Sequence, residues 1–194
     1  MTRVIDRGAI SAAYVGIGMA VTIAISFLLV IPIEPIYWLL ALPAGMLIGY
    51  YANQRSDRRA GPWCRIFANA LVAGLATALT LAAFILVVKA LFFFGDSGYP
   101  DFNRVDPTTH QTIPPSCDSG APCVYARYLA VGNGPQLAAA GITDVATFTT
   151  FYWNQQAAAA GTVLVLTLIG GIGGGLLYGT FRPKPSRSAL EAPG

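Results

Sequence analysis

The sequence predicts an all-α membrane protein with four transmembrane helices and one long, partly helical extracytoplasmic loop between the third and fourth helices. The 194 residues are 55% hydrophobic and only 11% charged, whereas about 25% of the residues of a soluble domain are charged. Long windows contain no charged residue at all, which is typical of membrane-spanning segments. The basic residues flank these windows and form no stripe that could bind nucleic acid, so we expect the lipid bilayer to be the main partner.

Residues 9–31 form the first predicted helix, which carries no charge. Arg3 and Arg7 precede it, but it is longer than the apolar region of about 7–15 residues in a signal peptide, so we expect it to stay uncleaved. Pro32 and Pro35 end it, because proline lacks an amide proton and restricts the residue before it. The tight turn makes the first and second helices antiparallel neighbours.

The second helix is predicted over residues 36–52, with aromatic residues at both ends, as at membrane interfaces. Pro43 predicts a kink. Gly45 and Gly49 form a GxxxG pattern, which lets helix backbones approach closely in lipid.

The third helix is predicted over residues 66–94, completing a region 1–94 that holds three spans. Its first half is rich in alanine, and its second half is bulkier and ends in phenylalanines. Lys89 is the one charge within an apolar run. We expect its aliphatic stem to carry the ammonium to the outer interface, in preference to a role in binding a substrate or ion.

The fourth transmembrane helix is predicted over residues 156–181, and Thr143–Asp144 is a candidate N-cap from which it could begin outside the bilayer. Glycines spaced by four place one small-residue face on this helix: Gly171, Gly175 and Gly179. This face could pack against the chain's own helices, which we favour, or form a groove for a partner. Residues 182–194 are broken by proline and predicted to be a flexible cytoplasmic tail.

The distribution of charge predicts the topology. Nine of the twelve Lys and Arg residues lie in the N-terminal head, the loop 53–65 and the tail. The insert 95–155 holds five aspartates and two arginines, a formal charge of −3. Because positive residues concentrate in cytoplasmic loops, we expect a multi-pass protein of the cell membrane with both termini cytoplasmic and residues 95–155 outside.

The insert contains two of the three cysteines, Cys117 and Cys123, separated by turn-forming residues. In an oxidising compartment we expect them to form a structural disulfide. A redox-active pair is the alternative, but no Cys-x-x-Cys spacing is present. Cys64, near the inner interface, is expected to be a free thiol.

The rest of the insert predicts two short helices, over residues 124–131 and 135–140, after an irregular stretch over residues 96–115. The lone His110 is expected to be an exposed loop residue. Asp101 to Asp106 does not match the spacing of a calcium-binding EF-hand loop. The sequence therefore predicts no catalytic residue, no cofactor site and no metal site.

These observations favour a non-catalytic accessory or structural subunit of a membrane complex. It would contact a partner, or a second copy of itself, through the fourth helix or the outer loop. One alternative is a small-solute transporter or channel that acts as an oligomer, since four helices enclose little space. The other is an outward-facing membrane enzyme or thiol oxidase.

Overall fold

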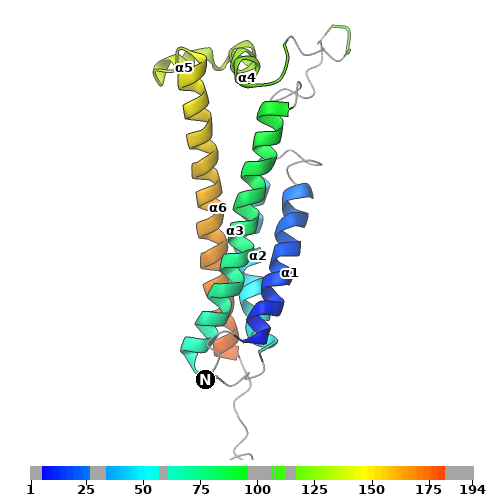
Figure 1. Cartoon of the computed structure of the whole chain (residues 1–194), viewed down its shortest axis with the longest axis vertical. Coiled ribbons are helices and arrows are strands. Elements are labelled where there is room, and N and C mark those ends of the chain that lie inside the picture. Colours follow the sequence, from blue (N-terminus) through cyan, green and yellow to red (C-terminus); the bar gives the residue numbers. More distant parts are fainter. Residues whose placement is uncertain are drawn as a thin grey trace, which may run out of the picture. The chain divides into compact units, whose positions relative to one another are not determined.

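The computed structural model of the chain describes residues 6–26, 34–56, 61–95, 106, 108–111 and 117–181, and every regular element within these ranges is helical. The α-helices are labelled in Figure 1. In chain order they are α1 (Arg7–Ile25), α2 (Glu34–Gln54), α3 (Trp63–Gly95), α4 (Ala121–Tyr128), the π-helix η2 (Leu129–Asn133), α5 (Gly134–Ala139) and α6 (Val145–Phe181).

Three of the described helices are long and apolar enough to cross a membrane: α1, α3 and α6. This agrees with the prediction of an all-helical membrane protein. The helix α2 is not among the three, although it has 21 residues.

Helix boundaries differ from those predicted in ways that local chemistry explains. The helix α2 begins at Glu34, so Pro35 lies in its first turn, where the missing amide proton costs no hydrogen bond. Pro43 lies inside α2, and the kink there stays a prediction. The segment predicted over 156–181 is the C-terminal part of the longer helix α6.

Several expectations fall outside the described residues. They are the end of the first helix and its turn within 27–33, most of the irregular stretch 96–115, and the tail 182–194. The loop 53–65 is described except for residues 57–60.

The chain divides into two compact units, which we describe separately. Unit 1 comprises Met1–Phe84 and Ala160–Gly194, and unit 2 comprises Ile85–Ala159. The helices α3 and α6 contribute residues to both.

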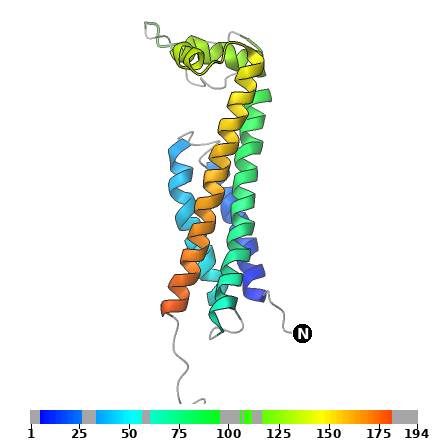
Figure 2. The same cartoon turned by 90° about the vertical axis from the view of Figure 1, so that its left-hand side faces the viewer.

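Unit 1 is a bundle in which small residues bring helix backbones together. Figure 2 shows α2 beside the unit 1 part of α6. Ala12 of α1, Ile48 and Ala52 of α2, and Ala73 of α3 form one buried cluster. Lipid offers no hydrophobic drive for helix association, so dispersion contact between close backbones has to hold such a bundle together.

The tightest contact is between α2 and α6, and glycines on both helices make it. A Cβ atom at Gly45 would overlap the carbonyl oxygen of Thr167, and one at Gly49 would overlap that of Gly171. From the other side, a Cβ at Gly174 would overlap the carbonyl oxygen of Met46. The two backbones thus meet through alternating glycines, and neither helix has room for a side chain there.

The other two glycines predicted on the α6 face also lie against the chain's own helices. A Cβ at Gly175 would be 2.9 Å from the Cβ of Ala70 in α3. One at Gly179 would overlap the ring of Trp63. In this arrangement α2 and α3 pack against the face formed by these glycines, which is the packing within the chain that the sequence favours.

We predict that Gly49→Ala lowers the stability of the bundle by about 1–3 kcal/mol, the usual cost of overpacking. The new methyl group would meet rigid backbone of α6. Thermal unfolding in detergent, followed by circular dichroism, measures the effect.

The matched control is Gly18→Ala on α1, because nothing lies within 4 Å of a Cβ at Gly18. Alanine favours the helix over glycine by up to about 1 kcal/mol, so this variant should be neutral or slightly stabilised. Equal losses in both variants would contradict the contact between α2 and α6.

Candidate functional site

Unit 2 contains most of the polar insert, and a disulfide bond fixes one edge of it. Cys117 pairs with Cys123, as predicted, with their Cα atoms 5.5 Å apart. Between them, the amide of Gly120 donates a hydrogen bond of 3.2 Å to the carbonyl of Phe93. The disulfide loop is therefore attached to the end of α3. Closing so short a loop contributes about 2 kcal/mol in the chain-entropy account.

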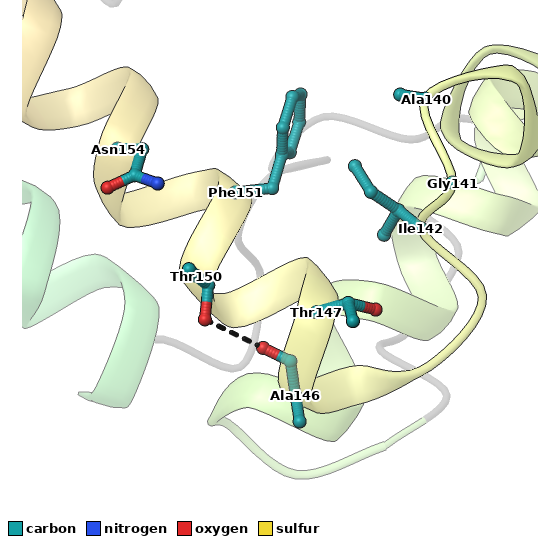
Figure 3. A pocket seen from close by; sticks show the side chains of 8 residues that line it. All are labelled: Ala140, Gly141, Ile142, Ala146, Thr147, Thr150, Phe151 and Asn154. Carbon is teal, nitrogen blue, oxygen red and sulfur yellow. Dashed lines mark hydrogen bonds between the residues drawn. The ribbon is translucent and has the colours of Figure 1, made fainter.

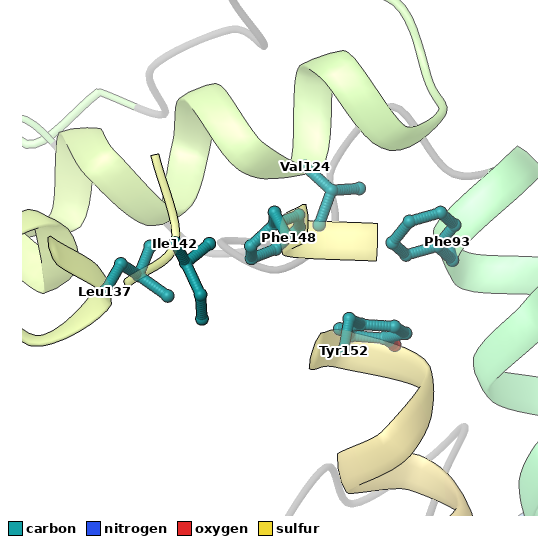
Figure 4. Close-up of a cluster of buried hydrophobic side chains, with 6 residues drawn as sticks. All are labelled: Phe93, Val124, Leu137, Ile142, Phe148 and Tyr152. Atoms are coloured by element: carbon teal, nitrogen blue, oxygen red, sulfur yellow. The ribbon is translucent and has the colours of Figure 1, made fainter. Parts of the chain in front are cut away.

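The core of unit 2 is aromatic. Six buried residues, drawn in Figure 4, come from α3, α4, α5, the loop before α6 and α6 itself: Phe93, Val124, Leu137, Ile142, Phe148 and Tyr152. The rings of Phe93 and Tyr152 have centroids 4.6 Å apart, and Tyr125 and Tyr128 each lie 5.1 Å from Phe148. Such pairs add about 0.5–1.5 kcal/mol each beyond the burial of their area.

Glycine sets the path of the chain between α4 and α5. The sequence predicts a short helix over 124–131, and in the structure α4 and η2 cover these residues. Gly132, at φ +91°, then interrupts the helical path before α5. Val124 is buried in the core of unit 2, whereas Val131 is 48% exposed. Gly141, at φ +74°, follows α5 and turns the chain toward α6.

The first turn of α6 is capped by Asp144, as the sequence predicts. Its Oδ1 accepts a 2.8 Å hydrogen bond from the amide of Thr147, and the Thr147 hydroxyl lies 3.3 Å from the amide of Asp144. These reciprocal bonds satisfy amide protons that a helix N-terminus leaves open. The bond from the Thr147 amide is the main cause that lowers the pKa of Asp144 below its ordinary value of 3.8.

A shallow, open groove of about 510 Å³ lies beside this cap (Figure 3). Ala140, Gly141 and Ile142 line one side, and α6 supplies the other side through Ala146, Thr147, Thr150, Phe151 and Asn154. No ionisable side chain lines it. It offers the half-buried ring of Phe151, the hydroxyl of Thr150 and the exposed carboxamide of Asn154.

The sequence did not single out this groove, because its two sides meet only after the chain turns at Gly141. The spacing of Thr147, Thr150 and Asn154 could have indicated one α6 face, since residues three and four apart are helix neighbours. It could not have indicated what lies opposite.

The structure places the remaining candidate residues separately. His110 is exposed, at φ 56°, in a turn where the carboxylate of Asp106 accepts hydrogen bonds from the amides of Thr108 and Thr109. Cys64 is an exposed free thiol. Among the residues that the structure describes, no three His, Cys, Asp or Glu side chains come together.

Two cations are buried in unit 2. Lys89 is 5% exposed and Arg127 is 6% exposed, and each contacts other groups of the chain. The sequence predicts that Lys89 extends to the membrane interface, whereas in the structure unit 2 encloses most of this residue. Arg127 lies in the last turn of α4, where a positive charge favours the helix dipole.

Comparison of the chain with protein-family models, with curated proteins and with solved structures found no match.

We predict that the first turn of α6 loses its protection as the pH falls below 3.8, the ordinary pKa of Asp144. Because the pKa of Asp144 is lower in the folded than in the unfolded protein, its carboxylate stabilises the fold at pH values above the unfolded-state pKa. This contribution is lost as the pH falls through the folded-state pKa. The protection factor of the Thr147 amide in hydrogen exchange reports the loss.

Asp144→Asn is the control, because asparagine also caps helices but does not titrate in this range. Its protection factor should stay level over the same pH interval. The same fall in both proteins would show that Asp144 does not cause it.

Proposed function

We propose that this protein crosses the membrane four times, with α2 as the additional span, and that its outer unit binds a partner within a membrane complex. At 21 residues, α2 matches the length of about 20 residues that crosses a bilayer. With four spans, both termini lie in the cytoplasm and residues 95–155 lie outside, in agreement with the positive charge of the loop 53–65.

Cys64 tests this topology, because it is the only one of the three cysteines outside the disulfide. In right-side-out vesicles a membrane-impermeant maleimide should leave Cys64 unlabelled. In inside-out vesicles the same maleimide should label Cys64. In a Cys64→Ala background, Thr109→Cys should give the opposite pattern, and identical labelling of both positions from one side would refute the topology.

The observation that carries the proposed function is a well-packed outer unit with an open, uncharged groove on it. The aromatic core and the disulfide order the loops of unit 2 before any partner arrives, which lowers the entropy cost of binding. The groove is lined by small residues, which allow close approach, around one half-buried aromatic ring. Aromatic residues of this kind often contribute most of the affinity of an interface.

We therefore propose a non-catalytic accessory or structural subunit, and we assign the groove as the surface that contacts its partner. The partner surface should be uncharged where it meets Phe151 and should offer a hydrogen-bonding group to Asn154.

Purification from the native membrane in mild detergent tests this proposal. The wild-type chain should co-migrate with a stoichiometric partner. Thr150→Arg should lose that partner, because it places a charge in a groove that has none.

Gln136→Arg is the matched control, since Gln136 is an exposed residue of α5 that does not line the groove. It should retain the partner. A wild-type chain that migrates alone would contradict the proposed function. If both variants retain the partner, only the assignment of the partner to the groove is contradicted.

A further inference from the structure

Two asparagines are buried in unit 1, and their hydrogen bonding differs. Asn53 of α2 and Asn69 of α3 are each 1% exposed. The Nδ2 of Asn53 donates to the carbonyl oxygens of Gly49 and Ile66, at 3.0 and 3.1 Å. Neither Nδ2 nor Oδ1 of Asn69 has a hydrogen-bond partner among the described residues.

A buried carboxamide without partners is unfavourable, because it has lost its hydrogen bonds to water and gained none. In a lipid-embedded bundle the cost cannot be relieved by exposure to solvent. The occupant that would relieve it at Asn69 must accept a hydrogen bond from Nδ2 and donate one to Oδ1.

The surroundings of Asn69 restrict the size of that occupant. On α3, Asn69 shares a helix face with Ala73 and Thr77, at spacings of four residues. Ala73 belongs to the buried cluster with α1 and α2, and Thr77 is also fully buried. Because Asn69 is only 1% exposed, an occupant beside its carboxamide has to be very small.

The hydroxyl of Thr77 does not satisfy Asn69, because it lies two helical turns further along α3, about 12 Å away. The Oγ1 of Thr77 donates to the carbonyl of Ala73, at 2.9 Å, within its own helix. A single water molecule meets all of these requirements, since it donates and accepts at once and fits sites that larger ligands cannot enter.

We propose that Asn69 holds one buried water molecule in unit 1, between α3 and the helices packed on its Ala73 face. The water is a component of the folded bundle, since it satisfies a carboxamide that is only 1% exposed.

Magnetic resonance on the full chain in lipid bilayers, with ¹⁵N-labelled asparagine, tests the site. Magnetisation transfer from water protons to the side-chain amide should build up several-fold faster at Asn69 than at Asn53. Asn53 is the matched control, because its carboxamide is equally buried but bonded to protein. The Asn69→Leu variant identifies the Asn69 signal by its loss.

Equal, slow transfer at both asparagines would overturn the proposal. An experimental map that resolves ordered water gives a second test. It should show one water within about 2.7–3.2 Å of both Nδ2 and Oδ1. An empty site, or a carboxamide bonded to a protein group, would also overturn it.

Discussion

Close backbone contact between α2 and α6 is the constraint on which unit 1 depends. In lipid, apolar side chains gain nothing by leaving the solvent, so helices associate where their shapes allow dense contact. Gly45 and Gly49 on one helix, and Gly171 and Gly174 on the other, remove the side chains that would separate the backbones. The same glycines would weaken a helix in water. Their use here is consistent with a bundle that folds within a membrane.

Unit 2 is stabilised by different interactions, because its insert is polar and holds few aliphatic residues. Aromatic rings supply the buried area, with Phe148 at the centre of contacts to Tyr125, Tyr128 and Tyr152. The disulfide and the Asp144 cap then order segments that a small core alone would leave loose. The result is a surface whose shape exists before binding.

The sequence was sufficient for features that depend on local chemistry. The apolar windows located the helices, the acidic residue before α6 located its cap, and the two cysteines of the insert located the disulfide. It was not sufficient where two distant segments decide the outcome. Glycine spacing on α6 indicated close packing but not that α2 and α3 would fill that face. The groove needed the turn at Gly141, and the open hydrogen bonds of Asn69 could be recognised only once its neighbours were in place.

The lengths of α3 and α6 connect the folding of the chain to the proposed function. These helices have 33 and 37 residues, whereas about 20 residues cross a bilayer. One end of each helix belongs to unit 2, and both Phe93 of α3 and Phe148 of α6 lie in its aromatic core. An outer loop joined to the spans only by irregular linkers would lose much of its entropy on binding. Helices supply two sides of this core, so the residues that line the groove are already ordered. A proposed binding surface of modest area benefits from this, because less entropy is lost when the partner binds.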